Sequence, residues 1–196
     1  MALCLLALLA ACGDRGPDFQ PLARDDVILA FGDSLTFGTG ANREQSYPAV
    51  LARLAGHEVI NAGVPGEISA DGLKRLPGLL EEYAPALVIL IHGGNDLLRK
   101  HHAVEIKRNL AAMVDLVRGY GAQVMLLAVP RPSLLLSADP LYAEVAGEQA
   151  VPLEEQALAE ILQSRSTRSD AIHPNAAGYA RLAQAIFRFL EERQAL

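Results

Sequence analysis

Short apolar runs recur along the chain and predict strands. The clearest is residues 86–91, which is apolar throughout and therefore typical of a strand buried on both faces. Residues 27–31 and 122–129 have the same character, residues 58–61 form a shorter run, and residues 150–153 a weaker one. We therefore expect about five strands.

Between these runs, apolar residues recur at helical spacing. In residues 69–83 four leucines fall on one helix face, and Ser69 and Asp71 stand where capping residues are expected. The other expected helices are residues 44–55, 104–120, 158–162 and 175–193. Strand and helix alternate at short spacing, which predicts an α/β fold with a parallel sheet and helices on both faces.

The first twelve residues, MALCLLALLAAC, are apolar and uncharged. The run is too short for a membrane-spanning helix, which needs roughly 20 apolar residues, and is typical of a secretory signal. Its end, LAAC, resembles a bacterial lipobox, in which the cysteine is lipidated. We interpret residues 1–12 as a lipoprotein-type signal with Cys12 as the lipidation site. A plain cleaved signal and an apolar start without structure are the alternatives.

The polar residues 13–25, which include two prolines, are interpreted as a linker. Residues 26–196 then form one domain, because no internal repeat or second domain is evident in the sequence. This organisation predicts export to the bacterial cell envelope, with a membrane contact through the lipid anchor on Cys12.

Composition and charge narrow the choice of partners. The chain has 196 residues and a formal net charge of -6, so it lacks the basic surface by which proteins bind nucleic acid. Both cysteines, Cys4 and Cys12, lie in the N-terminal apolar segment. We therefore expect no disulfide within the domain, which must fold on its core alone.

Small and polar residues follow three expected strands and precede the last helix. Ser34 follows the first strand, Gly63 the second and Asn95 the third, while Asp170 and His173 precede the last helix. In an open parallel sheet, ligands bind beyond the carboxyl ends of the strands. These residue types supply the components of acyl transfer at that edge.

The roles follow from the chemistry of the side chains. A serine hydroxyl is a poor nucleophile without a base, and His173 is suited to take the proton of Ser34 and return it to the leaving group. Asp170 lies three residues before His173, so in a tight turn its carboxylate accepts the Nδ1–H of the imidazole. Pro174 disfavours a helical conformation at His173 and supports such a turn.

The carbonyl under attack develops negative charge and needs hydrogen-bond donors. Each donor is worth roughly 10²–10³ in rate. The backbone N–H groups of Ser34 and Gly63 are candidates, because a side chain at Gly63 would crowd a carbonyl brought so close. The side-chain amide of Asn95 is a third candidate.

Four sequence blocks resemble those of the SGNH, or GDSL, hydrolases. They are GDSL at 32–35, the glycine at 63, GGND at 93–96 and DAIHP at 170–174, and they occur in the family's order. The motifs GDSLT, NAG and GGNDLLR are similar to those of the bacterial arylesterase, lysophospholipase and acyl-CoA thioesterase branch. A GDSL motif alone is weak evidence, whereas four blocks at strand and helix ends are specific.

The resemblance implies a flavodoxin-like three-layer α/β/α sandwich with a sheet of about five parallel strands. It implies Ser34, Asp170 and His173 as the catalytic triad, Ser34, Gly63 and Asn95 as the oxyanion hole, and neither metal nor organic cofactor. The expected activity is hydrolysis of short- to medium-chain esters through an acyl-enzyme on Ser34. Expected substrates are small-molecule aryl esters, lysophospholipids or acyl thioesters.

Other functions are compatible with parts of the sequence. A carbohydrate O-acetylesterase of the same fold is one alternative. A flavodoxin-like module that binds a phosphate or a flavin through FGDSLTFGTG, residues 31–40, is another. That stretch lacks both GxxxxGK[ST] and GxGxxG, and the binding module leaves Asp170 and His173 without a role.

The segment 131–148 follows the fourth expected strand and combines three prolines nearby with a run of leucines. We expect part of it to cover the acyl chain, with Leu134, Leu135 and Tyr142 as candidate pocket residues. The alternative is that it packs against the last helix. His92, which directly precedes the GGND block, receives no role from the sequence.

Overall fold

The computed structural model describes residues 17–131 and 136–196. Five parallel strands form one sheet in the order β2-β1-β3-β4-β5. The strands are β1 (Val27–Gly32), β2 (Glu58–Gly63), β3 (Leu87–Ile91), β4 (Gln123–Leu127) and β5 (Leu153–Glu154). This is the flavodoxin-like strand order, so the predicted fold class is confirmed.

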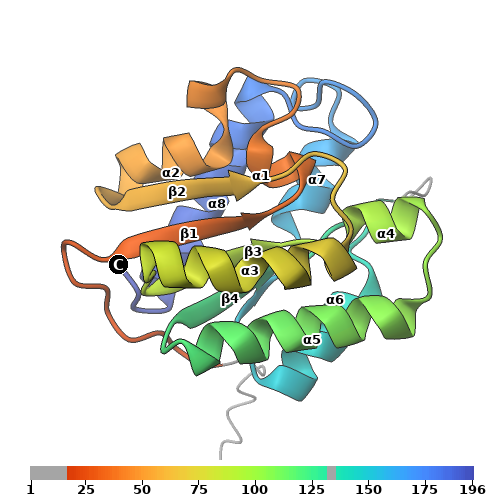
Figure 1. Cartoon of the computed structure of the whole chain (residues 1–196). Coiled ribbons are helices and arrows are strands. Elements are labelled where there is room, and N and C mark those ends of the chain that lie inside the picture. The colour runs from red at the N-terminus through yellow and green to blue at the C-terminus, as the bar shows by residue number, and fades with distance from the viewer. Residues whose placement is uncertain (1–16, 132–135) are drawn as a thin grey trace, which may run out of the picture.

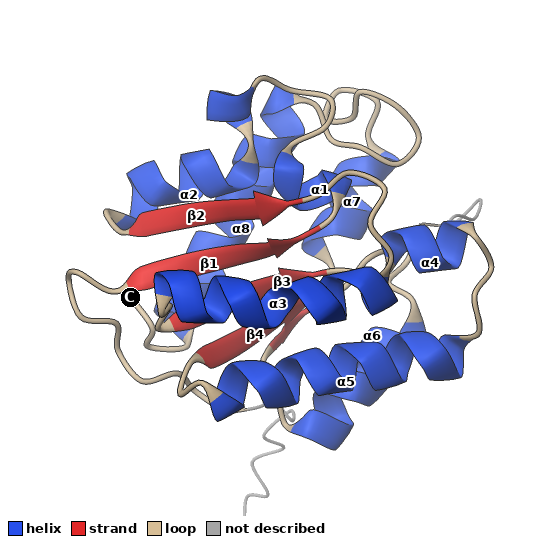
Figure 2. Ribbon diagram, viewed as in Figure 1, coloured by secondary structure: helices blue, strands red, loops and turns tan. Residues whose placement is uncertain are grey.

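Helices cover both faces of the sheet (Figure 1; Figure 2). On one face α3 (Ser69–Tyr83) packs beside α5 (Ala103–Gly119), and on the other α2 (Tyr47–Ala55) packs against α8 (Ala176–Glu192). The shorter helices are α1 (Ser34–Phe37), the 3₁₀ helix η1 (Arg43–Gln45), α4 (Gly94–Leu98), α6 (Pro140–Gln149) and α7 (Ala157–Gln163).

The centre of the sheet is the core of the domain. Every residue of β3 is fully buried, because α3 and α5 cover one face of the sheet while α8 covers the other. The two-sided burial explains why this strand is apolar throughout. The strand order reverses between β1 and β3, because β2 lies on one side of β1 whereas β3, β4 and β5 follow on the other. Such a reversal is the usual place for a ligand site in this fold.

Three helices differ from the sequence-based expectation. The helices α1 and α4 have four and five residues, which is too short for a periodic pattern. The longer α6 carried a signal that the prediction did not use: Asp139 accepts a hydrogen bond from the N–H of Leu141, and Pro140 is the first helical residue.

The expected caps of α3 are wrong. Ile68 occupies the N-cap position, while Ser69 is buried inside the first turn. The Ser69 hydroxyl donates to Asp96 Oδ1 at 2.7 Å, and its N–H donates to Asp96 Oδ2 at 2.8 Å. Ser69 therefore joins α3 to the start of α4, across the edge of the sheet.

The described part of the expected linker packs onto the domain. Phe19 is buried, its N–H donates to the carbonyl of Arg193, and the N–H of Leu22 donates to the carbonyl of Ala195. The linker interpretation is therefore wrong for residues 17–25. Residues 1–16, including Cys12, lie outside the described residues. Within residues 17–131 and 136–196, no helix has the length and apolar character needed to cross a membrane.

Candidate active site

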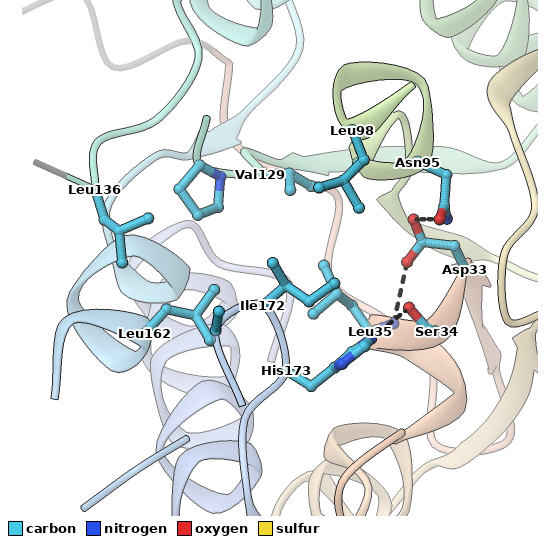
Figure 3. A pocket seen from close by; sticks show the side chains of 13 residues that line it. Asp33, Ser34, Leu35, Asn95, Leu98, Val129, Leu136, Leu162, Ile172 and His173 are labelled. Carbon is cyan, nitrogen blue, oxygen red and sulfur yellow. Dashed lines mark hydrogen bonds between the residues drawn. The ribbon is translucent and has the colours of Figure 1, made fainter. Parts of the chain in front are cut away.

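Ser34, His173 and Asp170 lie in one chain of hydrogen bonds, although 139 residues separate the first two. Ser34 is the first residue of α1, directly after β1, and His173 lies in the turn before α8. Ser34 Oγ is 3.0 Å from His173 Nε2 (Figure 3). His173 Nδ1 in turn is 2.8 Å from Asp170 Oδ2. The arrangement is that of a nucleophile, its base and the group that orients the base.

The turn around Asp170 fixes the orientation of the imidazole. Asp170 Oδ1 accepts the backbone N–H groups of Ile172 and His173, both at 2.8 Å, which leaves Oδ2 for the ring. Burial raises the pKa of Asp170, but the hydrogen bond from His173 and the two backbone N–H groups outweigh it, so the pKa lies below its ordinary value. An ionised Asp170 keeps the proton on Nδ1 and leaves Nε2 free to accept from Ser34.

Asp33 connects the nucleophile turn with Asn95. Its Oδ1 accepts the N–H of Leu35 at 3.0 Å, as expected for an aspartate bound to nearby backbone, and its Oδ2 accepts from Asn95 Nδ2 at 3.0 Å. Burial raises the pKa of this carboxyl. Asp33 therefore holds the side chain of Asn95 next to Ser34, and within the described residues it has no hydrogen bond to His173.

Gly63 does not have the free N–H that its expected role requires. Its N–H donates to Asn61 Oδ1 at 3.1 Å. A Cβ at Gly63 would clash with the backbone nitrogen of Phe37, so the glycine is needed for α1 to pack against the end of β2. The structure thus corrects the expectation that Gly63 is an oxyanion-hole donor.

A tight turn, residues 64–67, directly follows Gly63. The N–H of Glu67 donates to the carbonyl of Val64 at 3.2 Å, and Gly66 has φ +79°, which matches a type II turn with Pro65 and Gly66 at its centre. Among the described residues, no group accepts the N–H of Gly66. The next carbonyl, that of Glu67, accepts from Asn95 Nδ2 at 3.0 Å. The 64–67 turn therefore lies beside Asn95 with one backbone donor unused.

Comparison with known proteins identifies the family. The sequence profile of the GDSL-like Lipase/Acylhydrolase family matches residues 30–181. The chain belongs to this family. The resemblance to GDSL hydrolases is thus confirmed, and this GDSL hydrolase is an enzyme that acts on ester bonds.

Individual relatives of this GDSL hydrolase cover most of the chain. Esterase TesA of Pseudomonas aeruginosa is 32% identical over 180 residues, which is 86% of this chain and 90% of that protein. Thioesterase 1/protease 1/lysophospholipase L1 of Escherichia coli K12 is 30% identical over 161 residues, which is 78% of this chain and 77% of that protein. A crystal structure of TesA has a TM-score of 0.76 at 32% identity, covering 85% of this chain and 99% of that one.

An apolar pocket of the GDSL hydrolase opens beside Ser34 and His173 (Figure 3). The free space in the pocket and its mouth, open solvent included, is about 480 Å³. Its apolar lining comes from five different segments: Leu35, Leu98, Val129, Pro130, Leu136, Leu162, Ala171 and Ile172. In Figure 3, Leu136 and Leu162 lie across the pocket from Ser34.

Of the three expected pocket residues, the structure describes only Tyr142. Leu134 and Leu135 lie outside the described residues, and their neighbour Leu136 lines the pocket. Tyr142 does not line it: the side chain is fully buried, and its hydroxyl donates to the carbonyl of His92 at 2.7 Å. The Tyr142 prediction is wrong because α6 turns this residue into the core. In the part of the chain that the structure describes, no group of three or more His, Cys, Asp or Glu residues is placed to hold a metal ion.

A buried ion cluster lies behind the 64–67 turn of the GDSL hydrolase. The Glu67 carboxylate accepts from Arg75 Nε at 2.9 Å and Arg75 Nη2 at 2.7 Å, and His92 Nε2 lies 3.1 Å from Glu67 Oε2. Burial raises the pKa of Glu67, but the hydrogen bonds from His92 and Arg75 and the charge of Arg75 outweigh it. Together they lower the pKa from its ordinary value of 4.5 to about 2.

This cluster predicts an acid-dependent contribution to stability. Because the pKa of Glu67 is lower in the folded state, its contribution is complete above pH 4.5 and is lost as the pH falls towards about 2. Glu67→Gln is therefore expected to be less stable than the wild type at pH 7, with a difference that shrinks as the pH falls through this window. Urea unfolding at several pH values measures it.

The exposed Glu192→Gln at the end of α8 is the matched control. It is expected to change the free energy of unfolding little at any pH. A Glu67→Gln destabilisation that stays constant between pH 7 and pH 3 would contradict the prediction, because it would show that the charge of Glu67 is not what stabilises the fold.

Proposed function

We propose that the protein is a serine esterase that hydrolyses its substrate through an acyl-enzyme on Ser34. The observation that carries the proposal is the hydrogen-bond chain from Ser34 Oγ through His173 to Asp170. His173 Nε2 takes the hydroxyl proton as Oγ bonds to the carbonyl carbon, then gives that proton to the departing oxygen or sulfur. Water attacks the ester on Ser34 by the same proton transfers and releases the acid.

The proposed oxyanion hole consists of the N–H groups of Ser34 and Gly66 and the side-chain amide of Asn95. In the free enzyme both hydrogens of the Asn95 amide are engaged, by Asp33 and by the carbonyl of Glu67. An oxyanion carries more negative charge than a carbonyl and competes for one of them. This donor is thus used most strongly in the transition state, which is what accelerates the reaction.

The pocket suits the acyl portion of a substrate. Its walls are aliphatic, and its polar groups lie at the end that carries Ser34, Asn95 and His173. We propose short- to medium-chain carboxylic esters as substrates, with aryl esters, lysophospholipids and acyl thioesters as the candidate classes. Two similar proteins are named as an esterase and as a thioesterase and lysophospholipase.

A series of p-nitrophenyl esters from acetate to dodecanoate tests the activity and the pocket together. We expect saturable hydrolysis by the wild type, with a preferred chain length. Leu162→Phe fills the end of the pocket across from Ser34, so the preference is expected to shift to shorter chains. The kcat/KM ratio of octanoate to acetate should fall by about 10-fold or more, because each methylene is worth roughly 1–3 kcal/mol.

Leu54→Phe, which changes an exposed leucine of α2, is the control and should keep the wild-type preference. If no ester of the series is hydrolysed while acetylated sugars are, the carbohydrate O-acetylesterase is the correct function. If Leu162→Phe keeps the wild-type preference, the pocket does not hold the acyl chain.

We also propose that the protein is exported and lipidated at Cys12. This proposal rests on the apolar segment 1–12 and on its lipobox-like end. It places the enzyme in the bacterial cell envelope, where lysophospholipids and other lipid esters are available substrates.

A further inference from the structure

A fully buried histidine behind the 64–67 turn has no part in the mechanism above. His92 directly follows β3 and precedes the Gly93–Gly94–Asn95 segment of the site. A buried histidine needs partners for both ring nitrogens, since an unpaired polar group in the core is costly. What those partners hold in place indicates what the residue does.

The hydrogen bonds of His92 fix its protonation. The backbone N–H of Gly93 donates to Nδ1 at 2.9 Å, so Nδ1 is the acceptor and carries no proton. The single ring proton is then on Nε2, which donates to Glu67 Oε2 at 3.1 Å. His92 is therefore a neutral donor aimed at one carboxylate oxygen.

The packing around the ring allows little other orientation. A Cβ on Gly72 of α3 would clash with His92 Nε2, so the ring rests directly against the backbone of that helix. The ring of Phe31 lies on another side, with the two ring centres 5.7 Å apart. The carbonyl of His92 accepts from the hydroxyl of Tyr142. Strand β1 and helices α3 and α6 thus all hold His92 in place.

Glu67 transmits this position to the oxyanion donors. Its carboxylate is bound by His92 and Arg75 and is 8% exposed. Its own N–H closes the 64–67 turn on Val64, and its carbonyl accepts from Asn95. A displacement of the Glu67 side chain would therefore move both the adjacent Gly66 N–H and the Asn95 amide.

The remaining contacts hold the rest of the turn. Arg75 Nη2 also donates to the carbonyl of Ala62 at the end of β2, and its guanidinium lies 4.5 Å from the ring centre of Phe31. Arg99 of the α4 end donates to the carbonyl of Gly66 at 3.0 Å. The turn is thus fixed from α3 and α4, and His92 supplies the contact from the centre of the sheet.

We propose that His92 is a positioning residue for the oxyanion hole: its Nε2–H holds the Glu67 carboxylate so that Gly66 N–H and the Asn95 amide converge on the developing oxyanion. The inference rests on the proposed function, because it assumes an oxyanion at this place. His92 does not touch the substrate and acts only through Glu67. An error of about 1 Å in such donors can cost on the order of 100-fold in rate.

Two substitutions separate the two hydrogen bonds of His92. In His92→Gln the side-chain amide reaches the position of Nε2 and keeps a donor for Glu67. In His92→Asn the side-chain oxygen takes the place of Nδ1 as acceptor for Gly93, and the donor to Glu67 is lost. We expect His92→Asn to lower kcat for a p-nitrophenyl ester by about 10- to 100-fold with KM within about twofold, and His92→Gln to stay within about threefold of the wild type.

The affinity for a transition-state analogue is a measurement that should stay unchanged if the role of His92 is purely structural. An alkylboronic acid forms a tetrahedral adduct with the serine, whereas the free carboxylic acid resembles the product. In His92→Asn the affinity for the boronic acid should fall in parallel with kcat, while the affinity for the carboxylic acid stays constant. His57→Asn is the matched control, because His57 precedes β2 at the opposite edge of the sheet and, among the residues that the structure describes, hydrogen-bonds only to the carbonyl of Asp26.

Wild-type kcat in His92→Asn would overturn the inference, as would equal losses in His92→Asn and His92→Gln. If the His92 variants do not fold, Glu67→Ala removes the same contact from the other side and is expected to show the same loss of kcat and of boronic acid affinity. Wild-type values in that variant would also overturn the inference. Ser34→Ala in the same assays tests the proposed function separately from the role of His92. If Ser34→Ala keeps full turnover, the proposed function itself is wrong.

Discussion

Replacement of Ser34 by alanine is expected to lower kcat for a p-nitrophenyl ester by on the order of 10⁶-fold. Without the hydroxyl there is no acyl-enzyme, and His173 has no proton to take from residue 34. What remains is the hydrolysis that the oxyanion donors and the pocket promote with water alone. Initial rates with protein purified from a strain that lacks other esterases measure the effect.

The fold should tolerate this change. Within the described residues the Ser34 side chain forms one hydrogen bond, to His173, and alanine is a good helix former at the start of α1. The melting temperature is therefore expected to stay close to that of the wild type. Ser166→Ala, on an exposed serine before α8, is the control and should keep full activity. Turnover by Ser34→Ala within tenfold of the wild type would disprove the mechanism.

Asp170→Asn is expected to lower kcat by on the order of 10⁴-fold while leaving the geometry nearly unchanged. The asparagine oxygen is the natural acceptor for the N–H groups of Ile172 and His173, so its NH₂ group must face His173 Nδ1. Nδ1 then becomes an acceptor and the ring proton moves to Nε2. In that tautomer Nε2 cannot accept the proton of Ser34, and the nucleophile loses its base.

The pH dependence distinguishes this explanation from a simple loss of charge. Hydroxide can remove the serine proton without the histidine, so the rate of Asp170→Asn should rise with pH where the wild type has reached a plateau. Asp71→Asn, on an exposed aspartate of α3 that pairs with Lys74, should follow the wild type at every pH. Equal profiles for Asp170→Asn and the wild type would show that Asp170 does not set the tautomer.

The sequence indicated the fold and the set Ser34, His173 and Asp170 because each has a local signature. The buried run 86–91 identifies a central strand, and the spacing of Asp170 and His173 is sufficient for a turn in which the carboxylate reaches the ring. We associated Ser34 with His173 because a serine nucleophile needs a base. The fold brings the two together because the turn before α8 lies at the same edge of the sheet as the carboxyl end of β1.

The proposed oxyanion donor Gly66 was harder to predict, because a glycine can be required for two different reasons. Gly63 is needed for space beside α1, whereas Gly66 is needed for its positive φ in a turn. The pair Pro65–Gly66 is the usual signal of a type II turn and could have pointed to the second position.

The pocket could not be predicted for a different reason. Leu162 and Ile172 lie near the C-terminus, far along the chain from Leu35, and only the packing of α7 and the turn before α8 brings them to the same pocket. Tyr142 was misplaced because α6 was not expected, so the direction of its side chain could not be derived.

The path of residues 17–25 has a consequence for how a tethered form of this enzyme would meet its substrate. Gln20 pairs with Gln123, the first residue of β4, so the chain enters the domain at the amino-terminal edge of the sheet. Ser34 lies at the carboxyl-terminal edge, one strand length away. A lipid on Cys12 would thus pull on the end opposite the pocket mouth, and the enzyme would take esters from the surrounding fluid or an apposed surface rather than from the bilayer that holds it.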